Sequence, residues 1–178
     1  MKKKALYAAA IIYGASCSAY ASSGFETYGD IGQFAIPAIA AGISWYKDDT
    51  EGLKEFGYSL LSTTATVELL KNTVDSTRPN GGSKSFPSGH TAWAFSGASY
   101  LQMRYGWNYG LPAYLAAGAV GWSRVESDNH YWRDVIASAV IATGFSYVFT
   151  SPHKEQRLAF YPTIMEGDAK GIGFSYIY

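Results

Sequence analysis

The stretch SFPSGHTAWAF, residues 85–95, places a proline, a serine, a glycine and a histidine in consecutive positions directly before an apolar run. Pro87 interrupts any regular structure that precedes it, and Ser88 is a residue type that caps the first turn of a helix. That first turn exposes amide groups without carbonyl partners, so it attracts anions. Gly89 lets the backbone approach a ligand closely, and His90 then lies beside the anion. This pattern predicts a helix start that favours a bound anion; taken alone, it also fits a simple N-cap at Ser88 followed by an ordinary first-turn histidine.

Apolar residues recur near the 3.6-residue period of a helix on both sides of this motif. The expected helices cover about 28–47, 51–74, 91–105, 111–122 and 131–149. Pro37 is expected to kink the first helix. In the second helix the apolar residues near this period are Leu53, Phe56, Leu60, Leu61, Val67, Leu69 and Leu70.

The C-terminal tail differs, because RLAFYPTIM and IGFSYIY flank the turn-rich EGDAKG. This pattern favours a short β hairpin or an extended tail packed on the helices. We therefore predict an all-α fold, a single-domain bundle of about five helices, with a short C-terminal hairpin.

The N-terminus has the pattern of a secretory leader. Lys2, Lys3 and Lys4 precede a short apolar run, and Ala19-Tyr20-Ala21 has the small residues at which signal peptidase cleaves. We expect a signal peptide at residues 1–21, a mature domain at 22–178, and an exported, periplasmic protein. The alternative is a leader retained as a membrane anchor.

Charge and cysteine content exclude several classes of protein. The chain has 14 basic and 14 acidic residues, and loss of the three leader lysines leaves 11 against 14, a net charge of −3. Nucleic-acid binding needs a concentrated basic face, so no nucleic-acid partner is expected. Cys17, the only cysteine, lies in the leader, which excludes disulfides and thiolate metal sites from the mature chain. We expect no cofactor and no metal.

Two further polar clusters interrupt the apolar sequence. KNTVDSTRP holds Lys71 and Arg78, and by itself is typical of a solvated helix end. SRVESDNHYWRD holds Arg124, whose planar fork suits two phosphate oxygens. In the same cluster His130 and Asp134 are four apart, one helical turn. An Asp that accepts the Nδ1 proton leaves the Nε2 lone pair free, which makes a nucleophile or a base.

Together the three clusters resemble a known signature. The pattern Lys71-x6-Arg78-Pro79, Pro87-Ser88-Gly89-His90, Ser123-Arg124-x5-His130-x3-Asp134 is similar to that of the type 2 phosphatidic acid phosphatase superfamily. This superfamily includes bacterial nonspecific acid phosphatases and vanadium haloperoxidases. The resemblance covers residues 71–134, and it implies a helical bundle that transfers phosphoryl groups through a phosphohistidine without a metal.

The resemblance also implies a role for each signature residue. His130 would attack phosphorus, Asp134 would orient His130, and His90 would protonate the leaving oxygen. The phosphoryl oxygens would be held by Lys71, Arg78, Arg124, Ser88, the Gly89 amide and Ser123.

Only seven residues, 80–86, separate the first motif from the second, which is short for the superfamily that the chain resembles, where this connection often covers the pocket. We therefore expect a cavity with an open mouth. We therefore favour lipid-linked phosphates over soluble ones as substrates, with peripheral contact to a membrane. Since no run approaches about twenty uninterrupted apolar residues, a polytopic membrane protein is not favoured. The alternatives are a nonspecific soluble acid phosphatase or phosphotransferase, a vanadate-dependent haloperoxidase, and a noncatalytic phosphate binder.

Overall fold

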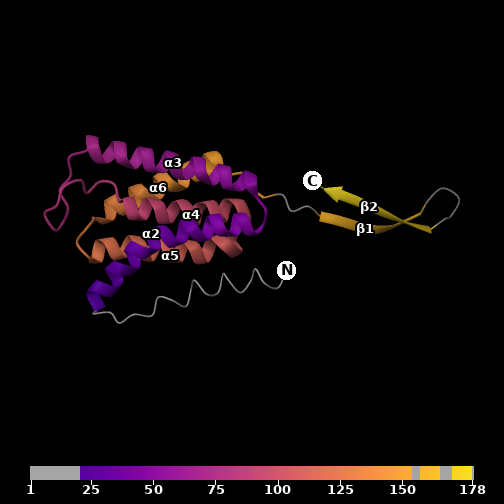
Figure 1. The fold of residues 1–178 in the computed structure, drawn as a ribbon, viewed down its shortest axis with the longest axis horizontal. Helices are drawn as coiled ribbons and strands as arrows, with labels where there is room; N and C mark the ends of the chain where they lie inside the picture. The colour runs from indigo at the N-terminus through magenta and orange to yellow at the C-terminus, as the bar shows by residue number, and fades with distance from the viewer. Residues whose placement is uncertain (1–20, 154–156, 165–169, 178) are drawn as a thin grey trace.

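The computed structural model describes residues 21–153, 157–164 and 170–177. Within these ranges the chain forms a bundle of five helices (Figure 1), with α4 packed against all four others. The helices are α2 (Ala21–Tyr46), α3 (Thr50–Thr73), α4 (Gly89–Tyr105), α5 (Trp107–Glu126) and α6 (Trp132–Phe149). The predicted all-α bundle is confirmed.

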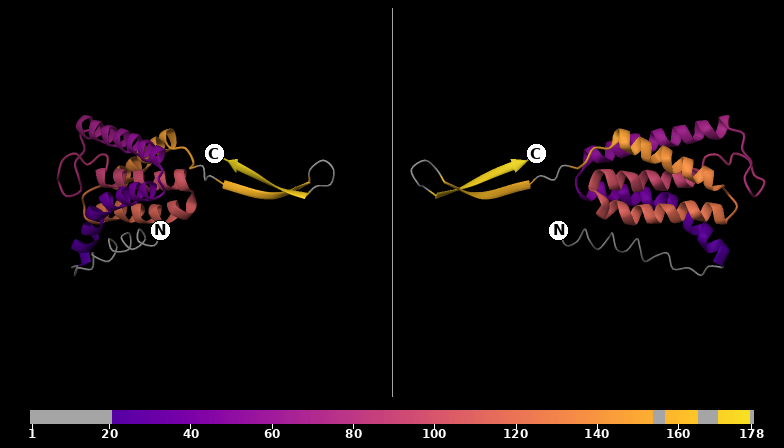
Figure 2. Two further views of the ribbon diagram at one scale, coloured as in Figure 1. Left: turned by 45° about the vertical axis from the view of Figure 1, so that its right-hand side comes forward. Right: turned by 180° about the vertical axis from the view of Figure 1, so that it is seen from behind.

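The tail after the helices forms an antiparallel hairpin. Its strands are β1 (Arg157–Ile164) and β2 (Lys170–Ile177), with Arg157 opposite Ile177. The hairpin extends beyond the ends of the helices in all views (Figures 1 and 2). Residues 1–20 of the predicted leader lie outside the described residues, so the domain boundaries stay a prediction.

Helix boundaries differ from the expected ones in ways that matter for the site. Helix α2 begins at Ala21 rather than near residue 28, and it continues through Pro37. Helix α4 begins at Gly89, because Ser88 has extended backbone and its Oγ accepts a hydrogen bond from the Thr91 amide. Helix α5 runs on to Glu126, which places Arg124 in its last turn.

Small residues fill much of the interior of the bundle, around larger buried side chains such as Phe56, Tyr100 and Leu101. Ala92, Ala94 and Ala98 of α4 are fully buried. Buried serines join the helices, since Ser99 Oγ donates to Ser146 Oγ at 2.7 Å. A Cβ at Gly97 would lie 2.9 Å from the backbone nitrogen of Pro37, so α2 and α4 cross in direct contact there.

The apolar period of 51–74 located helix α3 and part of its buried face, since Phe56 and Val67 are buried. Leu61 and Leu69 are 69% and 64% exposed, whereas Ser59 and Thr63 are fully buried. Among the described helices, none combines the length and the hydropathy needed to cross a membrane.

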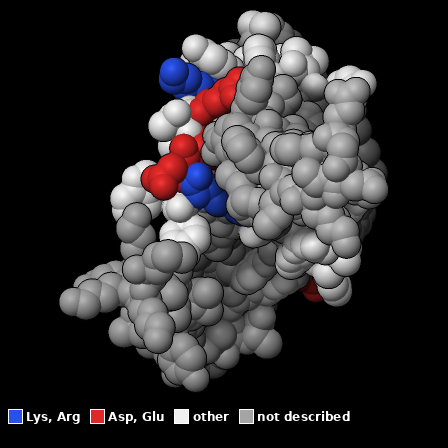
Figure 3. Space-filling view, turned by 90° about the vertical axis from the view of Figure 1, so that its right-hand side faces the viewer, with Lys and Arg blue, Asp and Glu red and all other residues white. Residues whose placement is uncertain are grey.

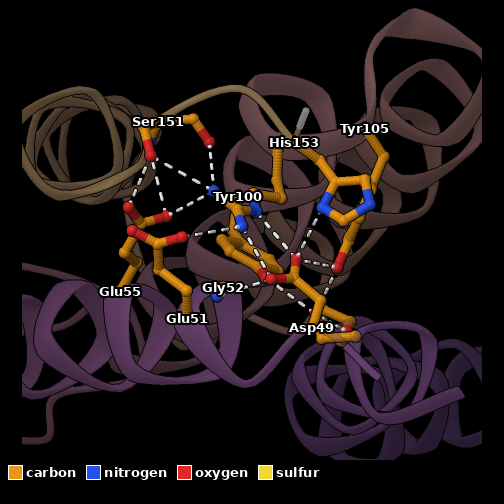
Figure 4. A network of polar contacts seen from close by, with 11 residues as sticks. Asp49, Glu51, Gly52, Glu55, Tyr100, Tyr105, Ser151 and His153 are labelled. Atoms are coloured by element: carbon orange, nitrogen blue, oxygen red, sulfur yellow. Dashed lines mark hydrogen bonds and ion pairs between the residues drawn. The ribbon is translucent and has the colours of Figure 1, made fainter. Parts of the chain in front are cut away.

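A polar cluster closes the end of the bundle where α3 begins and α4 ends (Figure 4). Arg104 donates from Nη2 to Asp49 Oδ1 at 2.6 Å and from Nε to Asp49 Oδ2 at 2.8 Å. Its Nη1 donates to the Ser151 carbonyl, and His153 Nδ1 lies 3.3 Å from Asp49 Oδ2. Acidic and basic side chains lie close together on this end of the molecule (Figure 3). The cluster thus ties the chain after α6 to the α2–α3 turn.

Candidate active site

The three motifs meet at the opposite end of the bundle, where α3 and α5 end and α4 and α6 begin. They share a cavity of about 410 Å³. Six of the predicted site residues line it: Lys71, Arg78, Gly89, His90, Arg124 and His130.

The loop between α3 and α4 fixes Arg78. The Arg78 amide donates to the Gly82 carbonyl at 2.7 Å, and the Gly81 amide donates to the Arg78 carbonyl at 3.0 Å. Gly81 has a φ of 85°, a left-handed conformation that favours glycine. Arg78 Nε donates to the Ser83 carbonyl at 3.1 Å, which holds the guanidinium beside the cavity.

His130 is buried, with 2% of the residue exposed, and is held from its backbone. Its amide donates to the Arg124 carbonyl at 3.0 Å. The imidazole Nδ1 lies 3.6 Å from Asp134 Oδ2, an ion-pair distance that is too long for the predicted hydrogen bond. Asp134 Oδ2 instead accepts from Ser85 Oγ at 2.5 Å and from the Tyr131 amide at 3.0 Å. Ser85 is therefore a neighbour that the sequence motif did not indicate.

Burial and the nearby cations make His130 a neutral imidazole. Burial lowers its pKa most, Arg78 and Lys71 lower it further, and the Ser85 backbone and Asp134 act in the opposite direction. The resulting pKa is about 4. At neutral pH the ring therefore keeps a free lone pair, as a nucleophile requires.

The same positive surroundings act on Lys71. Burial lowers the pKa of its ammonium group, and Arg78 adds to that effect. Clustered cations repel one another, so the cavity favours a bound anion.

His90 stands at the start of α4 beside a carboxylate of α2. Its Nε2 lies 3.0 Å from Asp30 Oδ1. Burial and Arg124 lower the pKa of His90, while the hydrogen bond to Asp30 raises it. Asp30 therefore favours the protonated ring that a general acid needs.

Arg124 is held at all three of its guanidinium nitrogens. Nη1 donates to Asp30 Oδ1 at 2.8 Å, Nη2 to the Glu26 carbonyl, and Nε to Ser123 Oγ at 3.2 Å. Sequence reasoning missed Asp30 and Glu26, because Asp30 belongs to none of the three motifs and Glu26 lies before the expected start of the first helix near residue 28. The available signal was two carboxylates four apart in an otherwise apolar stretch, a spacing that places them on one helix face.

Ser88 and Ser123 support the residues that line the cavity and are not themselves in its lining. Ser88 Oγ accepts from Thr91 Oγ1 at 3.0 Å, and Ser123 Oγ donates to the Val120 carbonyl at 2.7 Å. Both are fully buried. Direct contact of either hydroxyl with a phosphate stays a prediction.

The cavity is thus lined by two imidazoles, three cations and the N-terminus of a helix. This is the arrangement of a helical protein that binds an oxyanion and can react with it. The model of the PAP2 superfamily matches residues 52–157. The chain belongs to the PAP2 superfamily, as its three motifs predicted.

Curated relatives and a solved structure resemble the chain over different lengths. The lipid A 4'-phosphatase of Helicobacter pylori is 33% identical over 85% of this chain and 84% of its own length. Lipid phosphate phosphatase 1 of Arabidopsis thaliana is 34% identical over 51% of this chain and 34% of its own. The crystal structure of Aquifex aeolicus LpxE has a TM-score of 0.64 at 21% identity, over 75% of this chain and 87% of that one, and shares its fold.

Proposed function

We propose that the protein is a metal-independent phosphatase that hydrolyses lipid-linked phosphate monoesters or terminal diphosphates through a phosphohistidine at His130. The observation that carries the proposal is a neutral, buried imidazole in the same cavity as Lys71, Arg78 and Arg124. The names of the relatives, a lipid A 4'-phosphatase and a lipid phosphate phosphatase, support a lipid substrate.

The reaction follows from the placement of these groups. His130 attacks phosphorus, a P–N bond forms, and the P–O bond to the leaving group breaks while His90 donates its proton to the departing oxygen. Water then attacks the phosphohistidine, His90 takes the water proton, and phosphate leaves. The three cations neutralise the phosphoryl oxygens and supply the charge stabilisation that a metal provides in other phosphatases.

The pH dependence of kcat/KM follows from the two histidines. His130 must be neutral, so activity rises through its pKa of about 4. His90 must be protonated, and its pKa is lowered from 6.5, so activity falls as pH rises through a value below 6.5. We expect a bell-shaped profile with its maximum on the acid side of neutrality. A flat profile over this range, measured with a fluorogenic phosphate ester, contradicts the assignment.

The distribution of side chains supports contact with a lipid bilayer. Many buried positions hold small residues, although Phe56, Tyr100 and Leu101 are also buried, and many large apolar side chains face outward, as they do in proteins that contact lipid. On α5 the exposed side chains of Leu111, Leu115 and Trp122 follow helical spacing, and on α6 those of Ile136, Val140 and Tyr147 do the same. Exposed apolar faces of this extent mark interaction surfaces. We propose that these two faces contact lipid acyl chains.

Purified protein tests the function directly. We expect hydrolysis of phosphatidic acid and of a lipid A phosphate in mixed micelles, unaffected by a chelator. Activity on small soluble esters alone contradicts the lipid substrate, and activity that a chelator abolishes and zinc or magnesium restores contradicts the metal-independent mechanism.

Leu115→Glu tests the bilayer contact, because Leu115 is 69% exposed. It lies nine residues before Arg124, the residue of α5 that lines the cavity. A carboxylate in an apolar environment is costly, so we expect binding to vesicles of phosphatidylethanolamine and phosphatidylglycerol to fall about tenfold or more. Activity on a soluble ester should not change. Leu115→Ala is the matched control, since it keeps an apolar surface. Unchanged vesicle binding by the Glu variant contradicts the proposed contact.

A further inference from the structure

One carboxylate oxygen connects three helices at the cavity. Asp30 Oδ1, on α2, lies 3.0 Å from His90 Nε2 of α4 and 2.8 Å from Arg124 Nη1 of α5. These two partners are the general acid and a phosphate-binding cation of the proposed reaction. Asp30 lies outside residues 52–157, which match the superfamily model.

The contact of α2 with the site is built into the packing. A Cβ at Gly29 would overlap Ser123 Oγ and the guanidinium of Arg124, so only glycine lets α2 lie this close. One turn earlier, the Glu26 carbonyl accepts from Arg124 Nη2, and Glu26 Oε1 accepts from Asn129 Nδ2 at 2.9 Å. This turn of α2 therefore lines the cavity directly, through Glu26 and Asp30.

We propose that Asp30 is a positioning residue: its carboxylate accepts the Nε2–H of His90, which fixes the imidazole beside the cavity, and it also holds the guanidinium of Arg124 in place. The inference rests on the proposed phosphatase function and extends it to a residue outside the three motifs. Asp30 does not touch the reacting atoms; it acts through His90 and Arg124.

The charges around His90 show why such a residue is needed. Burial, Arg124 and Arg78 all lower the pKa of His90, and Asp30 is the carboxylate that opposes them by direct contact. The other charged or titratable side chains of the cavity are Glu26, Glu68, Lys71 and His130. Without Asp30 the ring would lose its proton at lower pH, and the leaving oxygen would have no donor.

The contact of His90 with Asp30 also indicates where the transferred proton lies before and after the substrate binds. In the free protein the Nε2 proton of His90 is held by Asp30 Oδ1. When the ester oxygen enters the cavity, this proton passes from Nε2 to the leaving oxygen as the P–O bond breaks. Asp30 still holds Arg124, so the cation that binds the phosphoryl group keeps its place.

Asp30→Asn tests the inference with a readout that does not need turnover. We expect the pKa of His90, followed by NMR of ¹⁵N-labelled imidazoles, to fall by about 1 unit when the charge is removed. His90→Gln identifies the signal by its loss. The alkaline limb of the activity profile should move to lower pH by the same amount. At the wild-type optimum kcat should fall about tenfold, with KM changed less than about threefold.

Two variants separate charge position from net charge. Asp48→Asn removes the same charge at the exposed α2–α3 turn, where φ is 55°, a conformation that Asn tolerates, and should leave the pKa of His90 unchanged. Asp30→Glu keeps a carboxylate and should restore most of the pKa and of kcat.

Three outcomes decide the matter. A lowered His90 pKa with lowered kcat supports the inference. An unchanged His90 pKa and an unchanged alkaline limb in Asp30→Asn overturn it. A lower KM at unchanged kcat also overturns it, because the carboxylate would then merely compete with phosphate for Arg124. If the wild type hydrolyses no phosphate ester, the proposed function fails while the NMR titration still reports whether Asp30 holds the proton on His90.

Discussion

Replacement of His130 by glutamine is expected to lower kcat by about 10⁴-fold or more, because the side-chain amide of glutamine cannot form the P–N bond of the proposed reaction. Glutamine is of similar size and polar, so the buried site stays filled and the cations keep their places. The dissociation constant for inorganic phosphate should differ by less than about threefold between wild type and variant, since Lys71, Arg78 and Arg124 still hold the anion. It is measured as a competitive inhibition constant in wild type and by calorimetry in the variant.

The intermediate itself gives a second readout. Quenching wild type in base with ³²P-labelled substrate should trap a phosphoenzyme that is stable in base and loses its label when it is then exposed to acid, as a phosphoramidate does. The His130→Gln variant should trap none.

His153→Gln is the matched control, because His153 contacts Asp49 at the opposite end of the bundle and lies outside the cavity lining. It should keep kcat within about twofold of wild type. Turnover near the wild-type level in His130→Gln would place the nucleophile elsewhere. A wild-type protein that binds phosphate without any turnover would instead be a noncatalytic binder.

The convergence of the three motifs could be predicted from the sequence because together they resemble one known signature, although no motif alone was decisive. A helix start with Ser88 and Gly89 predicts exposed amides, and the spacing of His130 and Asp134 predicts neighbours. The structure places His90, Arg124 and His130 on one cavity. What spacing could not give is the distance of 3.6 Å between His130 Nδ1 and Asp134 Oδ2, because Ser85 and the Tyr131 amide occupy the carboxylate.

Residues that act across the bundle were beyond sequence reasoning. Asp30 and Arg124 are 94 positions apart, and Ser85 and Asp134 are 49 apart. Periodicity reports which residues share a helix face but not which helix that face meets. On α3 the buried face was found only in part: Phe56 and Val67 are buried as expected, but Ser59 and Thr63 complete the face while Leu61 and Leu69 are exposed. Hydrophobic patterning assumes an apolar interior, whereas many buried positions of this bundle are serine or threonine.

Asp49→Asn is expected to cost about 3 kcal/mol of the free energy of unfolding, which corresponds to a fall in Tm of about 6–12 °C in a chain of this size. The side chains of Asp49 and Arg104 are 3% and 4% exposed, and the variant leaves the guanidinium buried beside a neutral amide. Asparagine still accepts from the Gly52 amide, as Asp49 Oδ1 does at 2.9 Å, so the cap of α3 is kept and the loss reports the charge pair. Thermal and denaturant unfolding, followed by circular dichroism, measure it.

The pH dependence of this difference has a definite sign. Burial alone would raise the pKa of Asp49, but hydrogen bonds from Arg104, Tyr105 and the Gly52 amide outweigh it and hold the pKa well below its ordinary value of 3.8. The stability that ionised Asp49 contributes is therefore fully present above that value and is lost as the pH falls below it. The difference in stability between wild type and Asp49→Asn should shrink under those acid conditions.

A double-mutant cycle separates the pair from its surroundings. Arg104→Met alone strands the Asp49 carboxylate in the interior, and we expect it to cost at least as much as Asp49→Asn. The double variant should recover part of the sum, because neither partner is then left charged and unpaired, and the non-additivity should be about 1 kcal/mol or more. Asp48→Asn, the exposed neighbour, should change stability by less than about 0.5 kcal/mol. Strictly additive losses would mean that Asp49 and Arg104 stabilise the bundle independently, through the α3 cap and through Glu55 and Ser151, and not as one ion pair.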